Sequence, residues 1–320
     1  MSVRANFLGK SIHPLSFGGA ALSGEGGGYG FGDISEADSI ELVRYAYESG
    51  VRVFDSAPVY GFGLSEKRLG LALKAVREEC VLISKSGISW HENKRIDMSN
   101  DPKLAEKMLL QSLKSFNTDY IDLYFIHWPD ERVDIRKPME VLAKYKEKGV
   151  IKHIGLCNTT LEDLEKASEI EKVEVVQSEY NLFNRSVENE VFPYLIDKGL
   201  DFMSWGTLDK GVLTGLYDLK RVFDDSDCRK KSPWWKKSDV EKKVELVNNC
   251  KKYLEGKDYN FIDLAISFNL HNIAQGTVLC GVKNKSRLDS IMNSIDRSQV
   301  IYTDFEYWDE LKVHLQKFYE

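Results

Sequence analysis

The 320-residue sequence has few cysteines and no apolar run long enough to cross a bilayer. The five cysteines are odd in number, widely scattered and without a CxxC pair: Cys80, Cys157, Cys228, Cys250 and Cys280. This pattern argues against a disulfide framework or a cysteine metal site and favours a reducing compartment. Because the N-terminal residues also lack the apolar segment of a signal peptide, we expect a cytoplasmic protein with no membrane segment and no bound metal.

An excess of positive charge is also missing, since 44 Lys and Arg residues stand against 50 Asp and Glu residues. The resulting net charge of -6 argues against a nucleic-acid partner, because phosphate binding needs clustered cations. The composition, with 42% hydrophobic and 29% charged residues, is that of a globular protein with a substantial core. No linker or shift in composition divides the chain, so we expect one domain over residues 1–320.

Short β-branched runs alternate with amphipathic helical stretches through most of the chain. Eight such runs predict strands at Leu15–Phe17, Val51–Phe54, Val81–Ser84, Ile121–Ile126, Lys152–Leu156, Val173–Gln177, Asp201–Ser204 and Thr277–Leu279. This alternation is typical of βαβ units around a parallel sheet. The predicted fold class is therefore α/β, and the architecture is a (β/α)8 TIM barrel.

Capping residues and glycines mark the ends of several predicted helices. Ser35 can cap a helix that ends at Gly50. The stretches near Lys137–Lys148 and Val187–Lys198 are each followed by glycine and the next strand, as in tightly wound βαβ units. A last helix is expected near Asp304–Phe318 and outside the barrel.

Two segments lack this alternation and are predicted to be loops, Gly24–Gly32 and Tyr217–Asp239. Each follows a strand, so a barrel would place both on the face that carries the active site. The glycine cluster contains no GxGxxG window, which argues against a Rossmann fingerprint and favours a mobile rim loop. The basic run RKKSPWWKK at Arg229–Lys237 is interpreted either as a phosphate clamp or as a solvated flap.

Polar or aromatic residues stand at the C-terminal ends of six predicted strands: Asp55, Lys85, His127, Asn158, Gln177 and Trp205. In a barrel these strand ends meet at one mouth. Any one of them could simply mark the end of an apolar strand. Together with Tyr60, however, an acid, a lysine and a histidine are the groups needed for proton transfer to a carbonyl oxygen.

The segment GVRVFDSAPVYGFGLSEKRLG at Gly50–Gly70 resembles the aldo-keto reductase segment that carries the family's aspartate and tyrosine. Other segments follow in the family's order: VLISKSG at 81–87, YIDLYFIHWPD at 120–130, IKHIGLCN at 151–158, VVQSEYNLFN at 175–184 and GVLTG at 211–215. The resemblance covers nearly the whole chain. It implies a barrel that binds a nicotinamide cofactor across its mouth and interconverts a carbonyl compound and an alcohol.

The resemblance also implies a catalytic role for four residues. Tyr60 would be the general acid in reduction and the base in oxidation. Because a free phenol is too weak an acid at neutral pH, Lys85 is expected to lower its pKa, and Asp55 to keep the lysine charged and oriented. His127 would hydrogen-bond the substrate oxygen without needing a charge. The alternative interpretation is a stabilising Asp55–Lys85 ion pair beside an ordinary packed histidine.

By the same resemblance, Asn158 and Gln177 would hold the nicotinamide carboxamide, and Trp205 would stack on the ring. The other implied cofactor contacts are Gly19, Ala20, Asp55, Gly206, Thr207, Leu208, Gly211, Gly281, Lys283 and Arg287. Lys283 and Arg287 are cations beside a helix start and would hold the adenosine 2′-phosphate. The expected cofactor is therefore NADPH, with NADH as the alternative.

Aromatic residues near strand ends, Tyr29, Trp90 and Trp128, are expected to form walls of the substrate pocket. Such walls suit a sugar or polyol and equally an aromatic aldehyde, so the expected partner is a small carbonyl compound or sugar. The pattern does not fix an oligomeric state. The chain departs from residues that are usual in the family at Cys157, Ser290 and Ile291.

The predicted function is NADPH-dependent reduction of an aldehyde or ketone. Two alternatives share the same fold and residues. One is a cofactor-binding regulatory subunit, as in the channel-associated β subunits of this fold. The other is an NAD-dependent dehydrogenase that oxidises a sugar or polyol, because the same side chains serve both directions.

Overall fold

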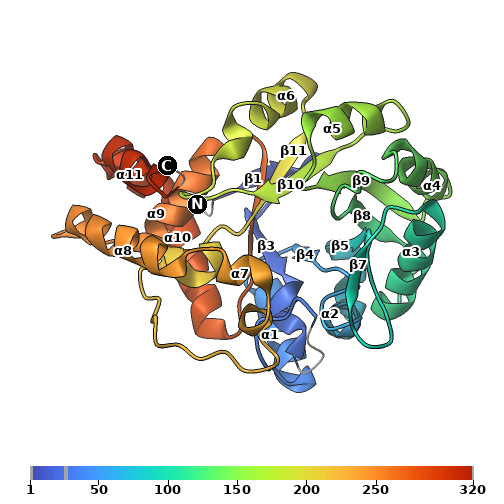
Figure 1. The fold of residues 1–320 in the computed structure, drawn as a ribbon, viewed down its shortest axis with the longest axis horizontal. Helices are drawn as coiled ribbons and strands as arrows, with labels where there is room; N and C mark the ends of the chain where they lie inside the picture. The colour runs from blue at the N-terminus through green and yellow to red at the C-terminus, as the bar shows by residue number, and fades with distance from the viewer. Residues whose placement is uncertain (1–2, 25–27, 319–320) are drawn as a thin grey trace.

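Eight parallel strands close into a barrel in this computed structural model, which describes residues 3–24 and 28–318. Around the barrel the strands are β3 (Leu15–Gly18), β4 (Val53–Asp55), β5 (Val81–Ser86), β8 (Ile121–Ile126), β9 (Ile151–Cys157), β10 (Val175–Glu179), β11 (Asp201–Trp205) and β12 (Gly276–Cys280), which pairs with β3. Each lies within two residues of the predicted position. The predicted (β/α)8 fold is confirmed, with the strands as a central ring and the helices outside (Figure 1).

The side chains of each strand alternate between the inside of the barrel and the surrounding helices. On β5, Val81 and Ile83 belong to the inner apolar cluster, whereas Leu82 belongs to the outer one. By this alternation Lys85 points inside and Ser84 faces the helices. The period of two therefore places a lysine at the top of a closely packed interior.

The helices that follow the eight strands are α1 (Glu36–Glu48), α2 (Leu64–Leu73), α3 (Pro102–Phe116), α4 (Arg136–Glu147), α5 (Leu161–Ser168), α6 (Val191–Lys198), α9 (Phe261–Asn272) and α10 (Lys285–Asp304). The predicted cap is confirmed, because the Ser35 hydroxyl accepts a hydrogen bond from the Asp38 N–H, and α1 ends just before Gly50. The predicted last helix is α11 (Trp308–Gln316). It begins later than expected because residues up to Asp304 belong to α10.

A β-hairpin that was not predicted closes the bottom of the barrel, where the strands begin. Its strands are β1 (Ala5–Phe7) and β2 (Lys10–Ile12). Phe7 and Ile12 are buried in the inner cluster, and the Leu8 N–H donates to Asp201 Oδ2 at 2.5 Å. Strands this short have little sequence signal, and burial against the barrel stabilises them.

The predicted loop Tyr217–Asp239 contains two short helical segments, so its assignment as a continuous loop is wrong. These are a 3-10 turn at Cys228–Lys230 and α7 (Pro233–Lys236), and they bury Arg229 and Trp235. The chain then continues into α8 (Val240–Cys250). The interpretation of the basic run as a solvated flap therefore fails for these two side chains.

The glycine-rich segment after β3 meets two other parts of the barrel mouth. Of the predicted loop Gly24–Gly32, residues 25–27 lie outside the described part of the chain. Gly28 forms an isolated β-bridge with Tyr60, and Phe31 forms one with Asp227. Within the described residues, no helix is both long and apolar enough to cross a membrane.

Candidate active site

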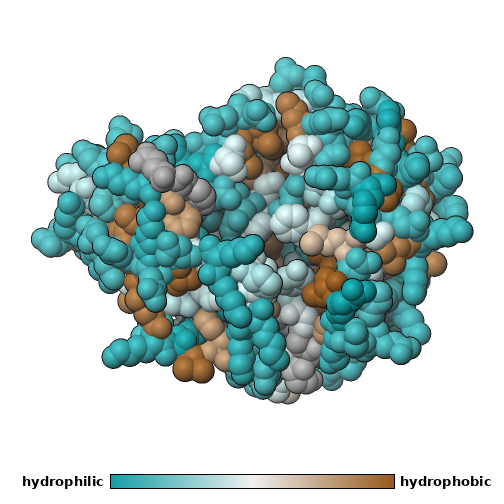
Figure 2. All heavy atoms as spheres, in the orientation of Figure 1, coloured by the Kyte–Doolittle hydropathy of each residue, from teal (hydrophilic) through white to brown (hydrophobic). Residues whose placement is uncertain are grey.

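A cavity of about 1190 Å³ opens at the carboxyl ends of the barrel strands. Asp55, Tyr60 and His127 line it together with the predicted cofactor residues Asn158 and Gln177. In Figure 1 the α7 loop lies in front of the barrel, so the face in Figure 2 is the mouth. Apolar and weakly polar side chains gather near its centre within a hydrophilic rim (Figure 2).

The buried pair Asp55–Lys85 lies beneath the cavity floor. Lys85 Nζ donates to both carboxylate oxygens of Asp55 at 2.6 Å and to the Ser56 carbonyl at 3.0 Å. Burial by itself would lower the pKa of Lys85, but the charge of Asp55 outweighs this effect and raises the pKa above its usual value. The ammonium therefore stays charged, as expected, although Lys85 itself does not line the cavity.

Tyr60 stands above this pair, with Lys85 Nζ 5.4 Å from the centre of its ring. Burial raises the pKa of Tyr60, and the charge of Lys85 lowers it. The effect of Lys85 has the expected sign, but burial is the larger effect, so the pKa of Tyr60 as a whole lies above its usual value. The phenol is therefore protonated at neutral pH.

Close backbone contact holds the loop that carries Tyr60. The Tyr60 N–H donates to the Ala57 carbonyl at 3.0 Å, and the Gly28 bridge covers the same segment. Gly28 has a φ of +66°, and a Cβ atom there would lie 2.2 Å from the Val59 carbonyl oxygen. Only glycine allows this approach, so one glycine of the predicted rim loop packs against the loop that carries Tyr60.

His127 completes the predicted set, with its ring centre 6.0 Å from that of Tyr60 and the two rings nearly perpendicular. Burial lowers the pKa of His127 well below its usual value, and the charge of Lys85 lowers it further. The imidazole is therefore neutral at pH 7 and can donate a hydrogen bond from one ring nitrogen, in agreement with the expected uncharged state.

The two amides predicted to hold the cofactor are hydrogen-bonded to two of the predicted catalytic residues, Asp55 and His127. Gln177 Nε2 donates to Asp55 Oδ2 at 3.0 Å, and Gln177 Oε1 accepts from Cys157 Sγ at 3.0 Å. Asn158 Nδ2 donates to the His127 carbonyl at 3.0 Å, and its Oδ1 accepts from Trp205 Nε1 at 2.9 Å. These hydrogen bonds fix the orientation of both amides at the cavity wall.

Most of the other predicted cofactor residues also line the cavity: Ala20, Trp205, Gly206, Thr207, Leu208, Gly211, Gly281, Lys283 and Arg287. Gly19 does not, because it packs against the β4 end, where a Cβ atom would lie 2.5 Å from the Asp55 carbonyl oxygen. Tyr29 and Trp128 line the cavity as predicted. Trp90 is not part of the lining, and its ring packs against Phe62 with 5.2 Å between the ring centres.

Arg229, from the run interpreted as a phosphate clamp or a flap, lines the cavity. Several other lining residues were not predicted from the sequence: Phe31, Ile88, Met98, Glu179, Lys210, Arg221 and Ser286. Ile88 and Met98 belong to a hairpin after β5, formed by β6 (Ile88–Trp90) and β7 (Ile96–Met98). The alternation of apolar residues in this hairpin is a signal that could have identified it. Lys210 directly precedes the GVLTG segment and could have been included with it.

The cations of the cavity fall into two groups. Lys210 pairs with Glu179 at 2.5 Å, Arg229 with Asp227 at 2.6 Å, and Lys243 with Asp209 at 2.8 Å. Lys283 and Arg287 form no ion pair with any described residue, and Lys283 Nζ donates only to the Phe31 carbonyl at 3.3 Å. Unpaired cations at the wall of a large cavity fit an anionic group such as the phosphate of a dinucleotide.

Comparisons with known proteins agree with this geometry. The sequence profile of the Aldo/keto reductase family matches residues 14–313. The chain is 31% identical over 284 residues to aldo-keto reductase YhdN of Bacillus subtilis, covering 86% of each chain. It is 27% identical over 264 residues to an NADH-specific methylglyoxal reductase of Escherichia coli, covering 77% of this chain and 80% of the relative.

The fold is similar to that of a solved glycerol dehydrogenase, AKR11B4 of Gluconobacter oxydans. The TM-score is 0.79 with 24% sequence identity, and the match covers 99% of this chain and 94% of the other. At this level of identity the likeness concerns the fold. The solved structure therefore supports the barrel and leaves the substrate to other evidence.

Proposed function

Because the chain belongs to the aldo/keto reductase family, we propose that it is an NADPH-dependent oxidoreductase that reduces an aldehyde or ketone to the alcohol, with Tyr60 as the general acid. The observation that carries this proposal is the position of a protonated Tyr60 at the cavity, above the buried Asp55–Lys85 pair and beside a neutral His127.

The cavity wall fits a bound nicotinamide. When bound, the cofactor supplies the hydride, which no protein side chain can supply. The side-chain amide of Gln177 donates its two N–H groups to Asp55 and Met203, but its Oε1 can still accept one more hydrogen bond. Asn158 keeps one N–H group, because its other N–H donates to His127. Together they offer one donor and one acceptor to a carboxamide, and Trp205 offers an aromatic face beside them.

The four catalytic side chains divide the proton chemistry among them. Tyr60 would donate its phenolic proton to the carbonyl oxygen as negative charge develops there. Loss of this proton leaves a phenolate, which the nearby Lys85 charge stabilises, and Asp55 keeps that charge in place. His127, neutral, would donate a hydrogen bond to the same oxygen and orient it. In alcohol oxidation the same groups act in reverse.

One relative of this chain is named as NADH-specific, so family membership alone does not fix the cofactor. The preference for NADPH rests on the charges at the cavity wall. Lys283 and Arg287 line the cavity without carboxylate partners among the described residues. A 2′-phosphate would satisfy both cations, whereas the 2′-hydroxyl of NADH carries no charge to do so. The unpaired cations therefore favour NADPH.

The first test is a titration of the purified protein with NADPH and NADH, followed by quenching of tryptophan fluorescence. We expect NADPH to bind more tightly, and Lys283→Ala to weaken NADPH binding by roughly tenfold while leaving NADH binding nearly unchanged. Lys285→Ala is the matched control, because Lys285 pairs with Glu41 at 2.5 Å on the protein surface. Binding of neither nucleotide to the wild-type protein would contradict the proposed function.

A further inference from the structure

Arg221 is a third unpaired cation at the cavity, and it comes from the loop between β11 and α7. It lines the cavity together with Lys283, Ser286 and Arg287. Its backbone N–H donates to the Asp218 carbonyl at 3.1 Å, and its guanidinium lies 5.3 Å from the centre of the Phe223 ring. It forms no ion pair with any residue in the described ranges, so its donors remain available to a ligand.

Other cations of this loop have acidic partners and are held in place by them. Arg229 is buried and bonds both oxygens of Asp227, and Lys230 and Lys231 pair with Asp225 at 3.3 and 2.8 Å. The loop is therefore rich in acids, yet none of them pairs with Arg221. This difference singles out Arg221 as the loop arginine that lines the cavity without a carboxylate partner in residues 3–24 and 28–318.

The loop is fastened across the mouth to the segment after β3. The Cys228 N–H donates to the Gly30 carbonyl at 2.9 Å, and the Gly32 N–H donates to the Ser226 carbonyl at 3.3 Å. Phe31 forms a β-bridge with Asp227 of this loop, and its carbonyl oxygen accepts a hydrogen bond from Lys283 Nζ. Phe31 therefore contacts both the loop and Lys283. The loop that carries Arg221 is thereby joined to the segment that also holds Lys283.

The charged surroundings of Lys283 include Arg221, which lines the same cavity. Burial lowers the pKa of Lys283, and the charge of Arg221 lowers it further. Asp227, Asp224 and Asp33 act in the opposite direction without overcoming the burial. Mutual repulsion between cations that lack a partner is relieved when a multiply charged anion binds between them.

We propose that Arg221 is a specificity-determining residue that completes, with Lys283 and Arg287, a three-cation site for the 2′-phosphate of NADPH. This inference rests on the proposed function. The planar guanidinium presents paired N–H donors that match the oxygens of a phosphate. A nucleotide without the 2′-phosphate gives Arg221 no partner, so the residue should act on NADPH and not on NADH.

The test compares Arg221→Ala and Arg221→Lys with Lys220→Ala in the full-length protein. Lys220 is the matched control, because it is an exposed neighbour in the same loop that does not line the cavity. Dissociation constants are measured for NADPH and NADH by tryptophan quenching, and for adenosine 2′,5′-bisphosphate and 5′-AMP by competition. We expect Arg221→Ala to weaken binding of NADPH and of the bisphosphate by roughly tenfold, and Arg221→Lys to restore part of the loss.

Binding of NADH and 5′-AMP should stay unchanged in every variant, and Lys220→Ala should leave all four constants unchanged. An equal loss of NADPH and NADH binding in Arg221→Ala, or no loss of either, would overturn the role of Arg221 while the proposed function stands. A rise in the KM of the carbonyl substrate with unchanged NADPH binding would also overturn it. If the wild-type protein binds no nucleotide, the proposed function fails and this inference fails with it.

Discussion

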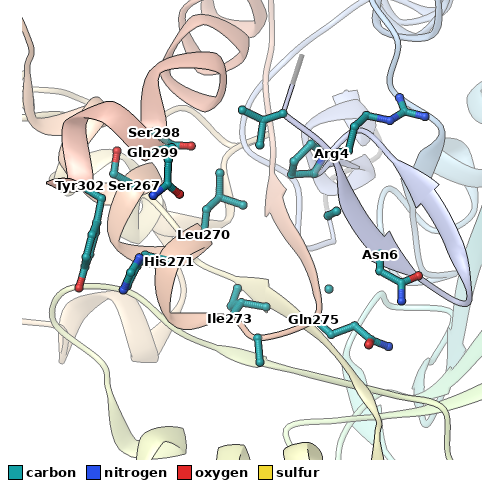
Figure 3. A pocket seen from close by; sticks show the side chains of 15 residues that line it. Arg4, Asn6, Ser267, Leu270, His271, Ile273, Gln275, Ser298, Gln299 and Tyr302 are labelled. Atoms are coloured by element: carbon teal, nitrogen blue, oxygen red, sulfur yellow. The ribbon is translucent and has the colours of Figure 1, made fainter. Parts of the chain in front are cut away.

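The two ends of the barrel differ in how completely their charged groups are satisfied by the protein. At the mouth, the cavity of about 1190 Å³ has three cations without partners among the described residues. At the bottom, a pocket of about 260 Å³ lies between the N-terminal segment, α9 and α10, with Arg4, Ser267, His271 and Tyr302 around it (Figure 3). Arg4 there donates to the Ser11 carbonyl, and His271 stacks on Tyr302. The mouth therefore holds cations without carboxylate partners among the described residues beside ion-paired ones, whereas Arg4 of the bottom pocket is hydrogen-bonded to a backbone carbonyl.

Carboxylates at the bottom connect neighbouring strands through backbone hydrogen bonds. Asp122 Oδ2 accepts from the Leu82 N–H at 3.0 Å, and Glu174 Oε2 accepts from the Ile154 N–H at 3.0 Å. Asp201 holds the N-terminal hairpin in the same way. Since barrel enzymes keep their active sites at the opposite end, this comparison indicates that bottom residues stabilise the fold and mouth residues serve ligands.

The largest effect is expected from Tyr60→Phe at the mouth. The change removes the proton donor, so kcat/KM for carbonyl reduction should fall by about 10²- to 10⁴-fold. Cofactor binding and thermal stability should stay unchanged, because the phenyl ring keeps its packing. Initial rates of NADPH oxidation with a panel of aldehydes and ketones measure the effect. Tyr302→Phe at the bottom pocket is the control. Equal losses of kcat/KM in the two variants would contradict the assignment of catalysis to the mouth of the barrel.

A change at the bottom should have the opposite result, loss of stability with retained activity. Asp122→Ala leaves the Leu82 N–H without a partner and removes the ion pair with Arg77 at 2.7 Å. We expect the free energy of unfolding to fall by roughly 3 kcal/mol, with unchanged kcat in the folded fraction. Urea titrations measure this, with the exposed Asp134→Ala as the control. A loss of kcat without a loss of stability would contradict a purely structural role for Asp122 at the bottom of the barrel.

Glu66 is a buried carboxyl that does not line the cavity at the mouth. It therefore tests whether a buried charged group outside the cavity affects stability. Burial raises its pKa from 4.5 to about 7, although hydrogen bonds from Ser84, Ser112 and Ser115 lower it. The folded state therefore binds more protons than the unfolded state between these values, and stability falls as pH rises from 4.5 to 7. At one pKa unit per 1.36 kcal/mol, this contribution is roughly 3 kcal/mol.

Glu66→Gln should remove this part of the pH dependence. Its free energy of unfolding should change less than that of the wild type between pH 5 and pH 8, as measured by urea titration at both values. The exposed Glu147→Gln should follow the wild type. Parallel pH profiles for the wild type and Glu66→Gln would show that Glu66 has an ordinary pKa.

The sequence predicted the repeated part of the fold well and the irregular part poorly. The eight strands follow from β-branched runs of regular spacing, and polar residues at their ends met at one mouth because parallel strands all end on the same face. The β1–β2 hairpin and the helical turns at Cys228–Lys230 and Pro233–Lys236 were missed, because contacts with distant segments stabilise these short elements.

The candidate site shows the same division between local pattern and distant contact. Residues at strand ends, such as Asp55, Lys85 and His127, were placed by the strands themselves. Trp90 was predicted from its position near a strand end and Gly19 from the family resemblance, but packing against Phe62 and against the Asp55 backbone keeps them out of the lining. Arg221 had no sequence signal, because the loop that carries it reaches the cavity through contacts with a segment far away in the chain.

By itself the sequence determined the barrel and the set of groups at its mouth. The hydrophobic pattern of each strand and the residue at its end can both be read from a short stretch of sequence. The tertiary structure decided how the pKa values of those groups are shifted. Burial outweighs the charge of Lys85 and raises the pKa of Tyr60, whereas burial and that same charge lower the pKa of His127. It also decided which cations remain unpaired. Solvent exclusion and the distance between charges exist only once segments far apart in the chain are brought together.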